Sequence, residues 1–307
     1  MTEERQIRLD ERVVIVTGAG GGLGRAYARL LGKRGARVVV NDLGVDMSGS
    51  GFDRNIADTV VEEIRSTGGE AFACYESIAD STGGQALVSA TLDNYGRVDG
   101  LIHNAGILRD KRFENLSDDD IDEVLDVHLK GAFNVGRSAF SAMKVRGFGR
   151  IVFTTSASGL FGNFGQANYG AGKTGLIGLM RVLNIEGSKY GILANCISPS
   201  ARTRMTEGLL GGLSNQLDPN HVAPLAVYLC SEECPFSSEI ISAGGGRFAR
   251  IFIGLTQGWY SGGDICSVEN ISEKMESIMK TNDFTIPGTG AEEIQAMIDT
   301  FGLGAER

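Results

Sequence analysis

Short apolar runs alternate with longer segments of helical periodicity along most of this chain. The apolar runs occupy residues 12–17, 37–42, 71–75, 98–103, 150–155, 192–197 and 239–243. Continuous apolar runs of this length are typical of strands that are buried on both faces. Helical patterns lie between and after them, at about 23–34, 54–66, 83–95, 117–143, 169–189 and 221–229. This alternation predicts an α/β fold: a Rossmann-type, doubly wound parallel sheet in three layers, α/β/α.

The pattern changes near residue 250, where a loop-like stretch precedes two short amphipathic helices. Their apolar residues recur at helical spacing, namely Val268, Ile271, Met275 and Ile278, and then Ile294, Met297 and Phe301. An amphipathic helix buries its apolar stripe against another surface. We therefore expect residues 1–250 to form the main domain. Residues 251–307 would form a C-terminal helical extension, packed on the core or on a partner subunit.

Composition narrows the class of protein. The 307 residues carry a net charge of −9 without a basic cluster, which argues against nucleic acid as a partner. The five cysteines and three histidines lack metal-ligand or redox spacing, so we predict reduced cysteines and no metal site. No apolar run approaches the roughly 18 residues of a membrane span, and the polar N-terminus is unlike a signal peptide. Because the chain does not end in Ser-Lys-Leu, we expect a cytoplasmic protein.

A glycine-rich turn joins the first predicted strand to the first predicted helix. Its sequence, TGAGGGLG, places Gly18, Gly22 and Gly24 where the chain turns. Free N–H groups and the positive end of the helix dipole at such a turn bind a pyrophosphate, and side chains there would block its approach. A glycine turn alone is a weak signal, but its place between a strand and a helix strengthens it. The turn therefore predicts a dinucleotide site.

Asp42 stands at the end of the second predicted strand, eighteen residues after Gly24. A carboxylate at this place accepts hydrogen bonds from both ribose hydroxyls of a dinucleotide and repels a 2′-phosphate. The neighbouring Gly21 and Leu43 bring no cation that would attract such a phosphate. NAD is therefore the predicted cofactor, rather than NADP. An aspartate that only caps a helix is the alternative.

Tyr169 and Lys173 lie four residues apart in a predicted helix, and Ser156 follows the predicted strand at 150–155. Residues four apart share a helix face, so the Lys173 ammonium can lie beside the Tyr169 phenol. A cation at about 4 Å supplies on the order of 4 kcal/mol at an effective dielectric near 20. Since one pKa unit is worth roughly 1.4 kcal/mol, we expect a lowered phenol pKa and general-base work near neutral pH. A tyrosine packed on a lysine stem is the alternative.

These motifs stand together in one order: TGAGGGLG, Asp42, NAG at 104–106, Ser156, Tyr169 and Lys173. In this combination, residues 8–250 resemble the short-chain dehydrogenase/reductase family. The stretches VVVNDLG, NAGILRD and SASGLFGNFGQANY are similar to one branch, the (3R)-3-hydroxyacyl-CoA dehydrogenase domains of multifunctional β-oxidation enzymes. The resemblance implies NAD-dependent oxidation of a (3R)-3-hydroxyacyl-CoA to a 3-ketoacyl-CoA. It also implies a homo-oligomer, either a dimer or a tetramer.

The same resemblance implies roles for individual residues. Tyr169 would be the general acid/base, Ser156 would orient the reacting oxygen, and Lys173 would lower the tyrosine pKa and bind the nicotinamide ribose. The implied cofactor contacts are Gly18, Gly21, Gly22, Leu23, Gly24, Asp42, Ser77, Ile78, Asn104, Ala105, Gly106, Tyr169, Lys173, Pro199, Ala201 and Thr203. Pro199 is followed by Ser200, where the family usually has glycine.

His128 departs from the family, which usually has an asparagine at this place to support a proton path. A histidine can donate or accept a hydrogen bond and titrates near neutral pH, so His128 is also a catalytic candidate. A histidine that merely fills a polar pocket is the alternative.

The substrate is less sharply indicated than the chemistry. An acyl-CoA is a polyanion, and the candidate cations for it are Arg109, Lys111, Arg112, Arg202 and Arg204. Each of them can equally be a solvated surface charge. The glycine-rich stretch at 202–213 is a candidate lid over a substrate. Two rival functions stay open: a 17β-hydroxysteroid dehydrogenase, and a sensor that binds NAD without turning it over.

Overall fold

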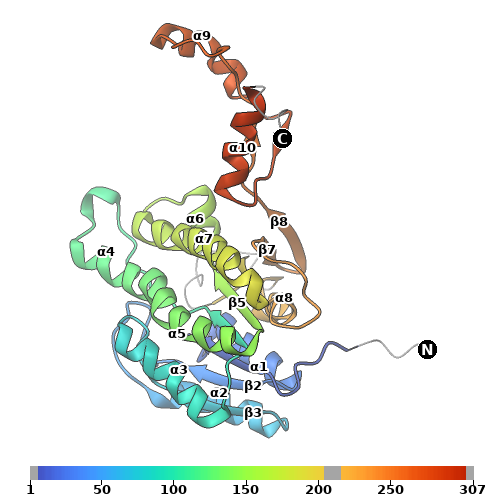
Figure 1. Ribbon diagram of the computed structural model, residues 1–307. Coiled ribbons are helices and arrows are strands. Elements are labelled where there is room, and N and C mark those ends of the chain that lie inside the picture. The colour runs from blue at the N-terminus through green and yellow to red at the C-terminus, as the bar shows by residue number, and fades with distance from the viewer. Residues whose placement is uncertain (1–5, 204–215, 302–307) are drawn as a thin grey trace. The chain divides into compact units, whose positions relative to one another are not determined.

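The computed structural model describes residues 6–203 and 216–301. Most of the candidate lid, and Arg204 with it, therefore lies outside the described residues. The chain divides into two compact units, Met1–Arg250 and Ile251–Arg307. In the first unit, helices cover both faces of a central sheet (Figure 1). The predicted doubly wound α/β fold is confirmed.

The central sheet has eight strands in the order β3-β2-β1-β4-β5-β6-β7-β8. All pairs from β3 to β7 are parallel. The strands are β1 (Val13–Thr17), β2 (Arg37–Asn41), β3 (Glu70–Cys74), β4 (Gly100–His103), β5 (Gly149–Thr154), β6 (Ile192–Pro199), β7 (Ile240–Gly244) and β8 (Arg247–Ile251). Every residue of β1, β4 and β5 is buried, as their largely apolar sequences predict.

Two groups of helices pack against this sheet. In one group, α1 (Gly22–Lys33) contacts α2 (Arg54–Ser66) and α8 (Ala223–Leu229). In the other, α5 (Gly131–Arg146) contacts α3 (Ser81–Tyr95) and α7 (Ala167–Gly187). The shorter α4 (Asp118–Leu125) and α6 (Ala157–Phe161) both contact α7. Single 3₁₀ turns occupy Phe113–Asn115, Ser188–Tyr190 and Pro219–His221.

The strand order reverses between β1 and β4, which are neighbours in the sheet. From β1 the chain proceeds outward to β2 and β3, and from β4 it proceeds the other way to β5, β6 and β7. The loops that leave β1 and β4 at their carboxyl ends therefore diverge, and they leave a crevice between them. In open α/β sheets this crevice is the usual ligand site.

Two elements of the first unit differ from the sequence predictions. The helix predicted over 117–143 is interrupted by a π-helical turn, Asp126–Lys130, which carries His128. The run at 239–243 was predicted to be the last strand, but β8 follows it. Gly245 and Gly246 connect the two strands, and both have positive φ, which suits a two-residue hairpin turn.

The second unit contains α9 (Val268–Ile278) and α10 (Gly290–Thr300), close to the two predicted helices. It also contains an antiparallel pair that was not predicted, β9 (Leu255–Thr256) with β10 (Phe284–Thr285). Phe252 stacks on Phe284 with 5.3 Å between ring centroids. Within 268–278 and 290–300 no residue is fully buried, so where this unit packs stays a prediction.

Candidate active site

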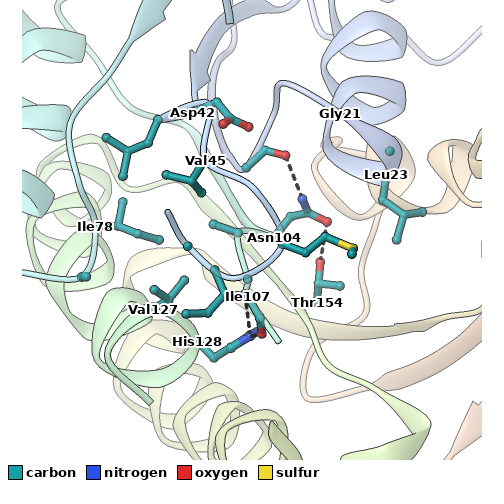
Figure 2. Close-up of a pocket in the computed structure, with 18 of the residues that line it drawn as sticks. Gly21, Leu23, Asp42, Val45, Ile78, Asn104, Ile107, Val127, His128 and Thr154 are labelled. Carbon is teal, nitrogen blue, oxygen red and sulfur yellow. Dashed lines mark hydrogen bonds between the residues drawn. The ribbon is translucent and has the colours of Figure 1, made fainter. Parts of the chain in front are cut away.

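A cavity of about 540 Å³ opens at the carboxyl ends of the parallel strands (Figure 2). Its lining comes from the loops after β1, β2, β3, β4, β5 and β6, from α4, from the π-helical turn and from α7. The predicted dinucleotide site and the predicted catalytic residues therefore border one continuous space.

Seventeen of the predicted site residues line this cavity. They are Gly18, Gly21, Gly22, Leu23, Asp42, Ser77, Ile78, Asn104, Ala105, Gly106, His128, Ser156, Tyr169, Lys173, Pro199, Ala201 and Thr203. Gly24 is the exception, because it lies underneath the turn. A Cβ on Gly24 would be 2.1 Å from the Gly18 carbonyl oxygen. Its missing side chain therefore allows α1 to pack closely on the turn.

The glycine turn after β1 has a backbone that only glycine adopts readily. Gly18 has φ +63° and Gly22 has φ +50°. A Cβ on Gly18 would lie 2.7 Å from Ala105 Cα, and one on Gly22 would lie 3.1 Å from Thr203 Cγ2. The turn leads directly into α1, whose N-terminal dipole end favours an anion. These residues fit the pyrophosphate of a dinucleotide.

The Asp42 carboxylate is held by two backbone donors. The Gly20 N–H donates to Oδ2 and the Gly44 N–H donates to Oδ1, each at 2.7 Å. Each carboxylate oxygen still has acceptor capacity for a ribose hydroxyl. Among the described residues that line the cavity, the lysine and arginine side chains are Arg109 and Lys173. The first of these, Arg109, is paired with Glu123.

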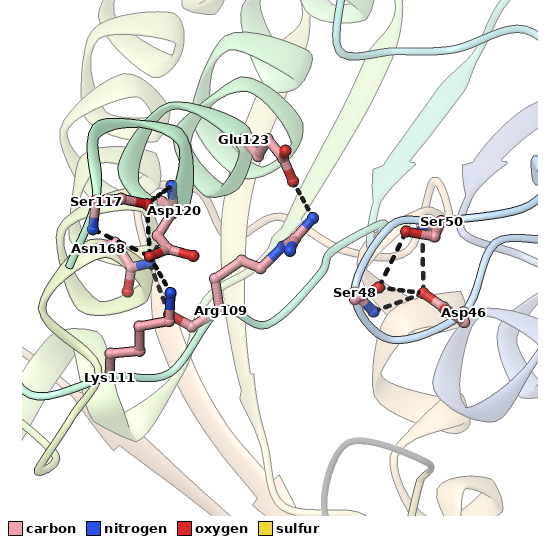
Figure 3. A network of polar contacts seen from close by, with 9 residues as sticks. All are labelled: Asp46, Ser48, Ser50, Arg109, Lys111, Ser117, Asp120, Glu123 and Asn168. Atoms are coloured by element: carbon pink, nitrogen blue, oxygen red, sulfur yellow. Dashed lines mark hydrogen bonds and ion pairs between the residues drawn. The ribbon is translucent and has the colours of Figure 1, made fainter. Parts of the chain in front are cut away.

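The loop after β2 lines the cavity, which sequence reasoning missed. Its contributions include Val45, Asp46, Met47 and Ser50. The Asp46 carboxylate accepts hydrogen bonds from the N–H groups of Ser48 and Ser50 (Figure 3). The Met47 carbonyl accepts one from the Leu108 N–H at 3.0 Å, which ties the loop to the segment after β4. Its position in the sequence could have identified this loop, because the polar, glycine-rich stretch follows Asp42 directly.

Asn104 connects the glycine turn to two strand ends (Figure 2). Its side-chain N–H₂ group donates to the carbonyls of Thr17 at 3.3 Å and Gly18 at 3.1 Å. Its Oδ1 accepts from the Thr154 hydroxyl at 3.4 Å. The hydrogen bonds of Asn104 therefore hold the glycine turn in place.

Lys173 is buried and lies close to Tyr169. Its Nζ is 5.5 Å from the centroid of the Tyr169 ring and donates to the Thr154 carbonyl at 2.7 Å. Burial lowers the pKa of Lys173 to about 7. The Ser156 Oγ caps α6 by accepting from the Ser158 N–H at 3.2 Å.

The expected lowering of the Tyr169 pKa is not what this structure gives. Burial raises the pKa of the Tyr169 phenol, the Ser156 hydroxyl lowers it, and the charge of Asp110 raises it further. The helical spacing did place the cation beside the phenol. However, Lys173 is buried as well, and near pH 7 it begins to lose the proton that would stabilise a phenolate. Desolvation of the phenolate is therefore the larger effect.

His128 projects from the π-helical turn and meets Tyr169 edge-on, with 5.1 Å between ring centroids. Its Nε2 lies 2.9 Å from the Ile107 carbonyl oxygen and 3.1 Å from the Ile107 nitrogen. Its Nδ1 is buried and has no hydrogen-bond partner among residues 6–203 and 216–301. Burial lowers the pKa of His128 well below its usual value, so the ring is neutral near pH 7. Turns of π type are frequent at functional sites.

Asn168 is a second residue that sequence reasoning missed. It is buried, and its side-chain N–H₂ group donates to the carbonyls of Arg109 at 3.2 Å and Asp120 at 2.8 Å. Its Oδ1 accepts from the Tyr169 N–H at 2.8 Å. The first turn of α7 is thereby tied to α4 and to the segment after β4 (Figure 3). Its place in the sequence, directly before Tyr169, could have identified it.

Comparison with known proteins decides the family. The model of the short chain dehydrogenase family matches residues 12–210. The chain belongs to this family. Short-chain dehydrogenases are oxidoreductases that act on CH–OH groups with NAD or NADP. In this member, one cavity is accordingly lined by the glycine turn, Asn104, Ser156, Tyr169 and Lys173.

The relatives of this short-chain dehydrogenase include longer proteins. Peroxisomal multifunctional enzyme type 2 of Mus musculus is 50% identical over 246 residues, which cover 80% of this chain and 33% of that protein. Hydroxyacyl-CoA dehydrogenase ChsB1 of Mycobacterium tuberculosis is 36% identical over 248 residues, 76% of this chain and 75% of that protein. The structure of full-length peroxisomal multifunctional enzyme type 2 from Drosophila melanogaster has a TM-score of 0.82 at 37% identity. The match covers 96% of this chain and 50% of the chain in that structure.

The described residues, 6–203 and 216–301, also bear on other kinds of site. Within them, no group of three or more histidine, cysteine, aspartate or glutamate side chains is arranged to hold a metal ion. Their helices include none with the length and apolar character that crossing a bilayer requires.

Proposed function

We propose that this short-chain dehydrogenase oxidises a (3R)-3-hydroxyacyl-CoA to the 3-ketoacyl-CoA with NAD. The observation that carries the proposal is the single cavity that joins the glycine turn and Asp42 to Ser156, Tyr169 and Lys173. Two of the relatives named above support the substrate class. One is named a hydroxyacyl-CoA dehydrogenase, and the other is a multifunctional peroxisomal enzyme with 50% identity over the matched region.

In the proposed reaction, the Tyr169 phenolate takes the proton of the substrate hydroxyl, and Ser156 donates a hydrogen bond to the same oxygen. A bound nicotinamide dinucleotide supplies the acceptor for the hydride that leaves the carbon. Lys173 uses one of its three donors on the Thr154 carbonyl and keeps the others for the phenol and a ribose hydroxyl. Because burial raises the pKa of Tyr169, the oxidation rate should increase with pH above neutrality.

His128 enters the proposal as a neutral hydrogen-bonding neighbour of Tyr169. Its neutral ring lies next to the phenol, and its Nδ1 is unpartnered within the described part of the chain. A neutral imidazole nitrogen at this place can accept a hydrogen bond and so help to orient the phenol or a bound ligand. Asp42 supports NAD over NADP, because its two oxygens are oriented by backbone donors and the nearby charge is negative.

A substrate screen tests the proposal. Purified protein is assayed for NADH absorbance with a (3R)-3-hydroxyacyl-CoA, with its 3S epimer and with a 17β-hydroxysteroid. We expect turnover of the 3R thioester, much slower turnover of the epimer, and a preference for NAD over NADP. Turnover of the steroid alone would make the protein a hydroxysteroid dehydrogenase. Binding of NAD without turnover of any alcohol would identify a sensor.

The cellular compartment and the oligomeric state also stay proposals. We expect a cytoplasmic protein, although the mouse and fly relatives are peroxisomal by name, and a fluorescent fusion would decide between the two. We also expect a homodimer or homotetramer. Light scattering of the purified chain measures the assembly.

A further inference from the structure

The cations considered for a CoA contact lie in different surroundings. Arg109 forms an ion pair with Glu123, and the Lys111 Nζ lies 2.5 Å from the buried carboxylate of Asp120 (Figure 3). A cation that is paired within its own chain attracts a further anion only weakly, because the two charges cancel at a distance. Arg202 is not among the described residues that line the active-site cavity.

Arg112 differs from Arg109 and Lys111, because its guanidinium has no ion-pair partner among the described residues and lines a cavity of its own. It forms no ion pair with any residue of 6–203 or 216–301. Its guanidinium carbon lies 5.6 Å from the centroid of the Phe164 ring. Together with Phe113, both residues line a second cavity, of about 470 Å³. Phe113 and Phe164 are 77% and 80% exposed, so this cavity presents aromatic faces beside a guanidinium that forms no ion pair within the described residues. Glu114 lines the same cavity, so an anion bound there must lie on the Arg112 side.

Backbone and side-chain hydrogen bonds hold this surface together. The Lys111 N–H donates to the Gly165 carbonyl at 2.9 Å, and the Gln166 side-chain N–H₂ donates to Asp110 Oδ2 at 2.6 Å. Asn163 donates to the Gln166 side-chain oxygen at 2.9 Å. The two segments 110–113 and 163–166 therefore form one platform. Gln166 directly precedes α7, the helix that carries Tyr169, so the platform adjoins the N-terminal end of that helix.

A nucleotide suits this combination of groups. A guanidinium pairs with phosphate oxygens through two parallel hydrogen bonds, and an exposed aromatic ring stacks on a base. The net charge of −9 repels a polyanion elsewhere, which gives an unpaired arginine particular weight. An acyl chain would also cover the two phenylalanines, but it has no anionic group to pair with the guanidinium.

We propose that Arg112 and Phe164 bind the adenine nucleotide end of an acyl-CoA at the mouth of the site. This rests on the proposed function, since it names the part of the thioester that the platform recognises. The Arg112 guanidinium pairs with a phosphate, and the Phe164 ring stacks on the adenine. The acyl end then extends from the platform toward Tyr169.

The test compares two thioesters of the same (3R)-3-hydroxyacyl group, one on CoA and one on N-acetylcysteamine, which has no nucleotide. We expect Arg112→Gln to raise KM for the CoA thioester by about tenfold to a hundredfold with kcat unchanged. Its KM for the N-acetylcysteamine thioester should equal that of the wild type. Arg112→Lys should fall between the two, and Phe164→Leu should show a smaller effect of the same kind. Lys189→Gln, which removes an exposed charge from the 3₁₀ turn Ser188–Tyr190, is the matched control.

Three results would overturn this subsite. In the first, Arg112→Gln raises KM equally for both thioesters, which would make the residue part of the acyl site or of the fold. In the second, neither KM changes. In the third, the variant alters the assembly measured by light scattering, which would make the platform a subunit contact. If the wild type turns over neither thioester, the proposed function fails instead, so the two failures are distinguishable.

Discussion

The two ends of the large cavity are built in different ways. At the dinucleotide end, backbone groups form the site: Gly18 and Gly22 have positive φ, and two N–H groups orient Asp42. At the chemical end, buried side chains that titrate form the site, and burial shifts the pKa of both Tyr169 and Lys173. Local conformation therefore governs the first end and solvent exclusion governs the second. Substitutions at the two ends should fail in different ways.

The largest effect is expected for Tyr169→Phe at the chemical end. It removes the phenol oxygen but keeps the ring that packs on His128. The rate should fall by about 10²- to 10⁴-fold, the usual contribution of a general base. NADH fluorescence titration should give a dinucleotide affinity close to that of the wild type. A variant that keeps a near-normal kcat would remove Tyr169 from the proposed mechanism.

The second prediction concerns acid sensitivity at the same end. His103 is buried, its Nε2 lies 2.9 Å from the His128 carbonyl oxygen, and burial lowers the pKa of His103 to about 4. Between pH 6.5 and 4 the unfolded chain binds a proton that the folded protein excludes, so stability falls as the pH is lowered through this range. Over the whole interval this amounts to roughly 3 kcal/mol.

In urea titrations, His103→Gln should lose less stability than the wild type between pH 7 and pH 4.5. The variant is expected to be less stable at pH 7, where it lacks the imidazole contacts, and the gap should narrow on acidification. His221→Gln, at an exposed histidine, is the control and should follow the wild type. Parallel curves for His103→Gln and wild type would contradict the assignment.

The same contrast explains what the sequence could predict. Strands, helices and most of the cavity lining follow from apolar runs and from the rule that parallel strands end at one edge. Gly18, Asp42 and Asn104 were found in this way. The i, i+4 spacing also brought Lys173 to Tyr169, but the direction of the phenol pKa depends on burial, which spacing does not encode.

Other features depend on contacts between distant segments. The loop at 43–50 has no periodicity, and its conformation rests on the Asp46 turn and on a bond from Leu108 to Met47. Asn168 gains its role only when α4 and the segment after β4 reach it. Gly24 was assigned to the cofactor because the turn was considered without the packing beneath it.

The third prediction turns to the dinucleotide end. Asp42→Ala removes a carboxylate acceptor from the proposed ribose site and the charge that opposes a 2′-phosphate. Hydrogen bonds to charged groups are worth about 1.5–3 kcal/mol, so affinity for NAD should fall roughly tenfold to a hundredfold while NADP is favoured relative to NAD. The kcat at saturating cofactor should change little. A wild type that already prefers NADP would show that Asp42 has another role.

The smallest effect, and the most local, is expected for Gly18→Ala. An alanine at φ +63° costs about 1–2 kcal/mol, and its Cβ would lie 2.7 Å from Ala105 Cα, so Ala105 and the turn must move apart.

Gly178→Ala is the matched control, because Gly178 is exposed in the interior of α7 and a Cβ there meets nothing within 4 Å among the described residues. That control should stabilise the protein by about 0.5–1 kcal/mol. Thermal unfolding with and without NADH separates the two consequences: Gly18→Ala should lower stability and also lose most of the stabilisation by NADH, whereas Gly178→Ala should keep it. If Gly18→Ala kept full stabilisation by NADH, the turn would hold α1 against the sheet without meeting the cofactor, and the dinucleotide end would have to be placed elsewhere in the cavity.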